Sequence, residues 1–280
     1  MGWLGQLKHR AVGAYVARFR TYGPMEFGAA LEQLGVRPGD ALMVHASMHA
    51  LSGFTGSPSQ LVSQLKEAVG EEGLVVMPSM TYSDSTQAFL LRAEPLRIAT
   101  SPSRMGLLSE MFRRSRGVCR SINPAHPLLA WGRDALEFVA GHDRTSYSFG
   151  DASPFRKLLD RDAAILCLDV PLEAVTFTHF LEDRHRDRLP FALYEPEPLE
   201  GRVVDRSGHT HVVQTFVLSE ESRRRRCEDV LWRSARRTGA VRTARVGNSR
   251  LQLMRCASLT RLFDQMFESG ENWFRADADA

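Results

Sequence analysis

Three side chains that can donate or accept a proton lie three residues apart between positions 176 and 182. Thr176, His179 and Glu182 supply a hydroxyl, an imidazole and a carboxylate. Residues three apart lie close together on one face of an α-helix, so a helix here would gather them into one patch. An imidazole is the usual proton acceptor near neutral pH, and a neighbouring carboxylate or hydroxyl fixes its orientation and tautomer. The spacing indicates either a helix-borne general base or an ordinary polar helix face.

The segments before this patch predict the elements that position it. Short apolar runs at residues 41–44, 74–77 and 165–168 are typical of buried strands. Between them, residues 57–69 and 106–114 have helical spacing, and Ser57-Pro58 is a strong helix start. This alternation predicts an α/β fold, a mixed α+β sandwich in which helices cover a central mixed sheet.

The second half of the chain has a different pattern. It predicts strands at 191–195, 203–204 and 209–217 with a turn at 206–208, one arginine-rich helix over 219–237, then two short strands and a helix at 258–267. We expect a single domain over residues 25–274, preceded by an amphipathic helix within 1–24 and followed by a frayed tail at 275–280. The first helix is expected to pack on its own domain or on a second copy in a homodimer, with attachment to a membrane surface as the alternative.

Composition excludes several classes of protein. The formal charge of +3 is too small to indicate nucleic-acid binding, and only Trp232 is interleaved with the basic residues at 223–245. No apolar run approaches the roughly 20 residues of a membrane span. The four cysteines form no C-x-x-C pair, which favours a reducing cytoplasm over a disulfide scaffold. His209 and His211 could be drawn into a metal site, but the histidine spacing is not that of zinc-binding helices, so we expect no metal.

The motif Thr176, His179 and Glu182, with Gly150, Ser153-Pro154 and the apolar run 163–168 before it, resembles the aminoglycoside 3-N-acetyltransferase family. Residues 34–48, 73–82 and 105–126 resemble the family's first strand and cofactor loop, second strand, and RS-x-x-P loop. The resemblance runs in consistent order from about residue 25 to 190 and weakens beyond it.

This resemblance implies an N-acetyltransferase that uses acetyl-CoA or another acyl-CoA. The acceptor amine would attack the thioester directly, with His179 as general base. Glu182 would either orient His179 or line the acceptor pocket, and Thr176 would face the cofactor. The implied cofactor-binding residues are His45, Ala46, Ser47, Met48, Ser57 and Ser153, although Ala46 and Gly56-Ser57 depart from the family's serine and double glycine.

On the acceptor side the resemblance implies Asp84, Glu110 and Asn123. An aminoglycoside is a polycation and suits an acidic pocket, whereas this chain has four consecutive arginines, Arg223 to Arg226, where relatives carry an acidic stretch. The acceptor is therefore either an aminoglycoside or another amino-sugar-like small molecule. The alternatives are a biosynthetic acyltransferase using another acyl-CoA or an acyl carrier protein thioester on a natural-product or nucleoside intermediate, and a non-catalytic relative.

Overall fold

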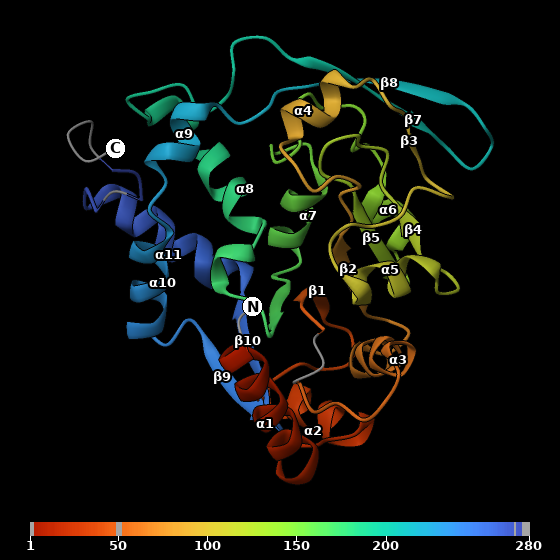
Figure 1. Cartoon of the computed structure of the whole chain (residues 1–280). Helices are drawn as coiled ribbons and strands as arrows, with labels where there is room; N and C mark the ends of the chain where they lie inside the picture. The colour runs from red at the N-terminus through yellow and green to blue at the C-terminus, as the bar shows by residue number, and fades with distance from the viewer. Residues whose placement is uncertain (1–2, 49–51, 272, 276–280) are drawn as a thin grey trace.

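A seven-stranded mixed sheet forms the centre of the molecule, in the order β4-β5-β2-β1-β6-β10-β9 (Figure 1). The structure, a computed structural model, describes residues 3–48, 52–271 and 273–275, with the side chains of 4–10 left aside. The strands are β1 (Ala41–Ala46), β2 (Leu74–Pro78), β4 (Cys119–Arg120), β5 (Leu128–Gly132), β6 (Ala164–Leu168), β9 (Arg242–Val246) and β10 (Ser249–Arg255).

The three middle strands are parallel, and the outer strands are antiparallel. β1 pairs in parallel with both β2 and β6, whereas β5 and β10 run against β2 and β6. Every residue of β2 and β6 is buried, because both faces of the sheet are covered by helices. The three strands predicted from apolar runs are these three, and the expected mixed sheet covered by helices is confirmed.

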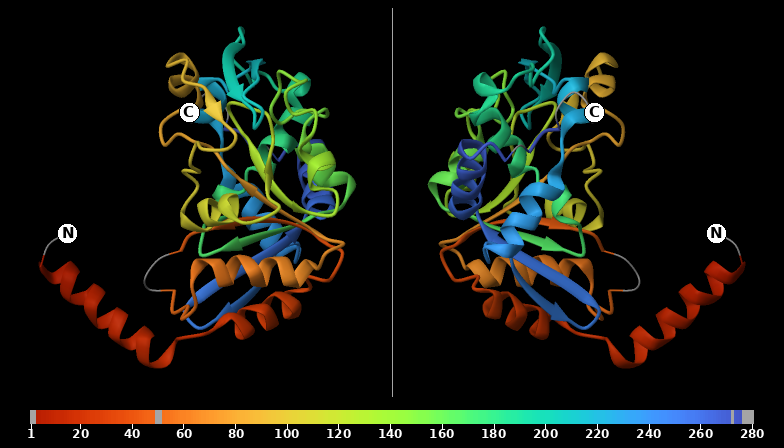
Figure 2. Two further views of the ribbon diagram at one scale, coloured as in Figure 1. Left: turned by 90° about the vertical axis from the view of Figure 1, so that its right-hand side faces the viewer. Right: turned by 90° about the vertical axis from the view of Figure 1, so that its left-hand side faces the viewer.

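Helices on the two faces enclose two separate cores. One face is covered by α2 (Pro24–Leu34), α3 (Pro58–Val69) and α5 (Leu107–Arg114). The other is covered by α6 (Ala135–Val139), α7 (Pro154–Asp160), α8 (Phe177–Arg184), α10 (Glu228–Arg237) and α11 (Cys256–Glu268). Figure 2 shows α2 and α3 below the sheet and the second group above it. The predicted helices at 57–69 and 106–114 are α3 and α5.

A three-stranded sheet lies apart from the main one. Its order is β3 (Leu96–Arg97), β7 (Leu199–Val204) and β8 (Thr210–Thr215). Helix α4 (Thr86–Leu91) packs against β7, and short 3₁₀ helices, η1 (Leu172–Ala174) and η2 (Arg186–Arg188), flank α8. The predicted strand at 191–195 is wrong: this segment is irregular and makes only an isolated bridge between Tyr194 and Leu218.

The arginine-rich helix and the first helix also differ from expectation. The predicted helix over 219–237 is two helices, α9 (Glu220–Arg225) and α10, because the backbone leaves helical geometry at Arg226 and Cys227. α1 (Trp3–Phe19) projects from the body in Figure 2. Of its side chains that the structure describes, only Val16 is buried, so among these only Val16 packs closely on the rest of the domain.

Two further features of the described residues bear on function. No helix among them is both long and apolar enough to cross a membrane. They also contain no group of three or more histidine, cysteine or acidic side chains arranged to hold a metal ion. His211 pairs with Asp205, and His185 pairs with Asp264.

Candidate active site

The candidate site lies where the parallel strands end. β1, β2 and β6 run in the same direction, so their carboxyl ends meet at one edge of the sheet, where ligand sites of α/β folds are found. Helix α8 follows β6 after the short helix η1 and begins at Phe177, with Thr176 as its N-cap residue. The predicted patch is therefore carried by the helix that leaves this edge.

Glu182 is a buried carboxylate with four hydrogen-bond donors. His179 Nδ1 lies 2.9 Å from Oε2, and Arg226 donates through Nε to Oε1 at 2.5 Å and through Nη2 to Oε2 at 2.8 Å. The indole Nε1 of Trp273 donates to Oε1 at 2.7 Å. An ionised carboxylate has about four lone-pair positions, so each oxygen is fully used. Glu182 is therefore in contact with His179 and has its four acceptor positions filled by protein groups.

Glu182 stays ionised in spite of its burial. Its side chain is 0% exposed, and burial by itself would raise the pKa of a carboxyl group. The charge of Arg226, with the hydrogen bond from His179, outweighs this effect and lowers the pKa of Glu182 to about 2. Because an ionised carboxylate only accepts hydrogen bonds, Nδ1 of His179 must carry the proton.

This tautomer leaves Nε2 of His179 as the nitrogen that can accept a proton. The His179 side chain is 20% exposed, whereas its partner Glu182 is closed to solvent. The arrangement is that of a general base held by a second, buried group, as in nucleophile-activating triads. The predicted roles of His179 and Glu182 are thus compatible with the geometry.

Two aromatic neighbours of His179 were not foreseen from the sequence. The ring of Phe149 lies 4.8 Å from His179 and 4.4 Å from His126, centroid to centroid. Burial lowers the pKa of His126 well below its usual value, with the charge of a protonated His179 acting in the same direction. His126 is therefore a neutral imidazole beside the candidate base. It occupies the loop that resembles RS-x-x-P, and only its neighbours in space indicate its place in the site.

A cavity of about 260 Å³ opens at the carboxyl ends of β1 and β2, next to α8. His45, Ala46, Ser109 and Thr176 contribute polar groups or backbone to its lining, and the remaining lining is apolar: Val44, Met77, Pro78, Met80, Met105, Val170 and Ala174. His45 Nε2 and Thr176 Oγ1 are buried atoms without a hydrogen-bond partner. Burial lowers the pKa of His45 to about 4, so this imidazole is neutral. The cavity is therefore an apolar slot with two unsatisfied polar groups.

The other predicted cofactor residues lie at different places. Ser47 donates its backbone N–H to Leu168, which ties the loop after β1 to the end of β6. Met48 packs beside the α2–α3 core. Ser57 begins α3, where its hydroxyl accepts from the N–H of Gln60. Ser153 begins α7 and is buried, and its hydroxyl accepts from Phe155, so it serves as a helix cap and does not face the cavity.

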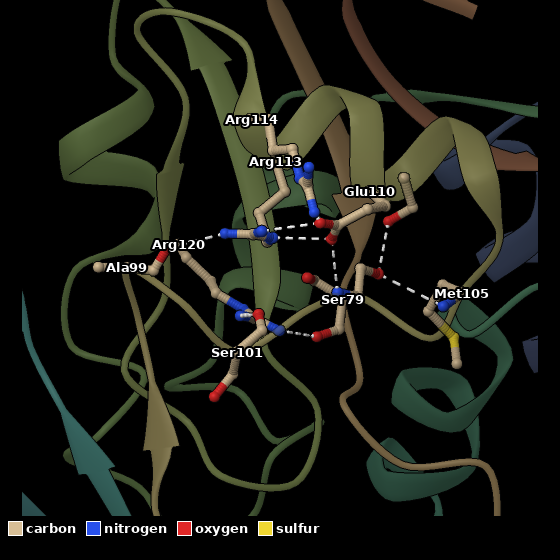
Figure 3. A network of polar contacts seen from close by, with 10 residues as sticks. Ser79, Ala99, Ser101, Met105, Glu110, Arg113, Arg114 and Arg120 are labelled. Atoms are coloured by element: carbon tan, nitrogen blue, oxygen red, sulfur yellow. Dashed lines mark hydrogen bonds and ion pairs between the residues drawn. The ribbon is translucent and has the colours of Figure 1, made fainter.

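Glu110, predicted to bind the acceptor, is instead the centre of an internal network (Figure 3). It accepts from Arg113 at 2.8 and 2.7 Å, from Arg114 at 2.6 Å and from the Ser103 N–H at 2.8 Å. Hydrogen bonding to Arg113 is the main reason that its pKa falls to about 2. All four lone-pair positions are used by protein donors, and binding of the acceptor by Glu110 stays a prediction.

Asp84 and Asn123 are also engaged. Asp84 is partly exposed and is paired with Arg92 through both oxygens. Asn123 is fully buried and shapes its own loop, because its Oδ1 accepts from the N–H groups of Ala125 at 3.0 Å and His126 at 2.8 Å. Asn123 thus holds the backbone of the loop at His126, and its contact with an acceptor stays a prediction.

Comparison with known proteins shows the family to which this chain belongs. The family model for aminoglycoside 3-N-acetyltransferase matches residues 43–268. The chain belongs to the aminoglycoside 3-N-acetyltransferase family. Membership identifies it as an N-acetyltransferase. It is similar to aminoglycoside N(3)-acetyltransferase III of Pseudomonas aeruginosa, with 31% identity over 189 residues that make up 62% of this chain and 69% of that protein.

A second relative of the same name, from Serratia marcescens, is 31% identical over 166 residues, 55% of this chain and 61% of its own length. Among solved structures, the apoenzyme of AAC(3)-IVa superposes with a TM-score of 0.74 at 23% identity, covering 93% of this chain and 94% of that one. The binary complex of AAC-IIIb with CoASH gives 0.74 at 24% identity, with 89% and 97% covered. These likenesses establish that the fold is that of the aminoglycoside 3-N-acetyltransferases.

Proposed function

We propose that this chain transfers an acetyl group from acetyl-CoA to an amine of an aminoglycoside or another amino-sugar-like small molecule. The amine nitrogen attacks the thioester carbonyl, a C–N bond forms, the C–S bond breaks, and free coenzyme A leaves. His179 Nε2 takes the proton that the amine must lose. The observation that carries this proposal is the buried, ionised Glu182 bonded to His179 Nδ1, because it prepares Nε2 as the accepting nitrogen.

The apolar cavity is the proposed place of the pantetheine arm. It is lined by Thr176 on the same helical face as His179, so a thioester held there would lie beside the base. Its two unsatisfied groups, on His45 and Thr176, could pair with the polar groups of that arm. Cys167 is an unsuitable nucleophile, since burial raises the pKa of its thiol to about 12. Direct transfer without an acyl-enzyme is the mechanism that the family resemblance implies, and the state of Cys167 is compatible with it. The four free thiols suit a reducing compartment such as the cytoplasm.

A second candidate has a specific observation in its favour. The acidic residues expected to receive a polycation are paired with arginines: Asp84 with Arg92, and Glu110 with Arg113 and Arg114. Glu182 is likewise occupied by Arg226. This favours an acceptor with few amino groups, such as a biosynthetic intermediate, delivered free and acetylated from coenzyme A or from an acyl carrier protein.

The test is release of free thiol from acetyl-CoA against aminoglycosides, simple amino sugars and nucleoside amines. His179→Ala is the catalytic variant, and His209→Ala, an exposed histidine on the β7–β8 turn, is the matched control. The proposal is supported if the wild type turns over acetyl-CoA, the His179→Ala variant does not, and the His209→Ala variant does. Turnover only with non-drug amines selects the biosynthetic alternative. Failure to bind acetyl-CoA would overturn the acetyl-CoA proposal.

A further inference from the structure

The break between α9 and α10 lies at Arg226, whose side chain points toward α8. Four arginines lie in a row, yet only Arg226 turns toward α8; its side chain is 12% exposed and forms a two-bond pair with Glu182. Its neighbour Arg225 bonds instead to Glu221 and stacks over Phe191. A continuous helix would point residues 225 and 226 about 100° apart on its surface. Here the backbone leaves helical geometry at Arg226, and the guanidinium of this residue contacts Glu182.

The C-terminal segment 273–275 holds this interruption in place. Cys227 donates its N–H to the carbonyl of Trp273 at 2.8 Å, and Arg275 donates to the carbonyl of Arg225 at 2.7 Å. Phe274 forms an antiparallel bridge with Arg226. Trp273 and Phe274 are both buried. We call residues 273–275 the C-terminal strap. It fixes the backbone of Arg226 and at the same time delivers the indole N–H of Trp273 to Glu182.

We propose that Arg226 and Trp273 are positioning residues for acetyl transfer, and that the C-terminal strap completes the catalytic unit by placing both on Glu182. This rests on the proposed function, in which His179 is the base. Three of the four donors on Glu182 come from these two residues, and the fourth is His179 itself. They hold the carboxylate ionised in a site closed to water, and this fixes Nδ1–H of His179 toward it.

The energetics support a positioning role. A carboxylate buried without a partner binds a proton instead of staying charged. A neutral Glu182 would lose its hold on the His179 tautomer, so the base would have to be aligned anew in each cycle. The groups facing Glu182 are His179 on α8, Arg226 at the helix interruption, Glu228 on α10, Trp273 of the strap and Tyr194. Arg226 is the one permanent cation among these five.

The test uses four variants and two readouts. Arg226→Gln removes the charge and one of the two paired donors, Arg226→Lys keeps the charge, and Trp273→Phe removes only the indole N–H. Arg225→Gln is the matched control, because Arg225 is similarly buried and touches the same strap through the Arg275 carbonyl. One readout is kcat against pH for acetyl transfer to sisomicin. The other is the low-field NMR proton of His179 Nδ1–H in the free protein, assigned by its loss in His179→Asn.

We expect Arg226→Gln to lower kcat at pH 7 at least tenfold and to move the acidic limb of the profile to higher pH by one unit or more. Arg226→Lys should recover part of this loss, and Trp273→Phe should give a smaller shift in the same direction. The NMR proton should weaken in the same order and remain in Arg225→Gln. Equal effects of Arg226→Gln and Arg225→Gln on both readouts would overturn the proposal. If sisomicin is not a substrate, the NMR readout still tests the positioning role of Arg226 and Trp273. Failure of the proposed acetyl-transfer function can therefore be distinguished from failure of the positioning proposal.

Discussion

Two glutamates flank Arg226, and their surroundings drive their protonation in opposite directions. Glu182 accepts a paired contact from Arg226 and is ionised. Glu228 lies 3.9 Å from Arg226 Nε, and burial raises its pKa to about 7, since the attraction of Arg226 only partly opposes desolvation. The guanidinium is committed to one carboxylate, so the other remains poorly compensated. A pair of acids with separated pKa values beside a base is typical of a catalytic site.

Glu228→Gln tests this imbalance through stability. The pKa of Glu228 is raised in the folded state, so its contribution to stability is present at low pH and is lost as the pH rises through about 7. Glutamine does not titrate. Relative to the wild type, the variant should therefore gain about 2–3 kcal/mol in unfolding free energy between pH 5 and pH 8. Urea unfolding at the two pH values measures this, and a difference independent of pH would contradict it.

For individual residues, the sequence predicts the contact between His179 and Glu182 but not the contacts that Arg226 and Trp273 make with Glu182. His179 and Glu182 are three residues apart, and helical periodicity alone brings them together. Arg226 and Trp273 lie 44 and 91 residues from Glu182 along the chain. The run of four arginines can be recognised in the sequence, but the sequence does not indicate which arginine side chain points inward. That orientation depends on backbone contacts with the C-terminal strap.

Helix α3 shows what a local signal can establish. The Ser57 hydroxyl accepts a hydrogen bond from the Gln60 N–H, and the Gln60 side-chain oxygen accepts one from the Ser57 N–H. Pro58 is the first residue of the helix. This capping box is readable from sequence, and the helix begins where predicted. The same amides could hold a phosphate of coenzyme A, but Ser57 lies outside the lining of the cavity at His45.

Ser57→Ala separates the two roles. Loss of the cap should lower the unfolding free energy by about 1 kcal/mol. If backbone amides and not the hydroxyl meet the phosphate, the Kd for coenzyme A should stay within about threefold of wild type. Denaturant unfolding and calorimetric titration give the two numbers. A tenfold weaker Kd with unchanged stability would show that the hydroxyl binds ligand and that the cap is dispensable.

Two segments, 191–195 and 219–237, were predicted wrongly from the sequence because their structure depends on long-range contacts. Residues 191–195 have strand-like composition, but Leu193 and Tyr194 are buried in the core beside α8, and no neighbouring strand lies along them apart from one bridge. Strand formation depends on a partner more than on propensity. In the same way, helix propensity runs through 219–237, while the strap contacts at Arg226 and Cys227 interrupt it.

Across the whole molecule, buried imidazoles are the main acid-sensitive groups. His45 and His142 lie on different elements, and burial lowers the pKa of each to about 4. His142 is held by Ser121 Oγ at 2.9 Å and the Ser148 carbonyl at 3.0 Å, and it connects the loop carrying His126 to the loop carrying Phe149. Protonation of these histidines therefore loosens the fold at the candidate site.

The sign of the effect follows from linkage. The folded pKa of each histidine is below its unfolded value of about 6.5, so stability is full above pH 6.5 and is lost as the pH falls through about 4. By pH 5 each of these two histidines should cost about 2 kcal/mol relative to pH 7, and so should His126, whose pKa burial also lowers well below its usual value. Glu228 titrates the opposite way and offsets about 2 kcal/mol over the same interval. The wild-type protein should therefore lose about 4 kcal/mol between pH 7 and pH 5.

The Glu228→Gln protein should reveal the full effect of the three buried histidines, a loss of about 6 kcal/mol between pH 7 and pH 5. Adding His142→Gln should return about 2 kcal/mol of that loss, even if it lowers stability at pH 7, because the pH dependence is what the titrating group controls. Urea unfolding of the three proteins at both pH values measures this. An unchanged pH dependence on removing His142 would contradict this, because it would mean that the pKa of this imidazole is the same in the folded and the unfolded protein.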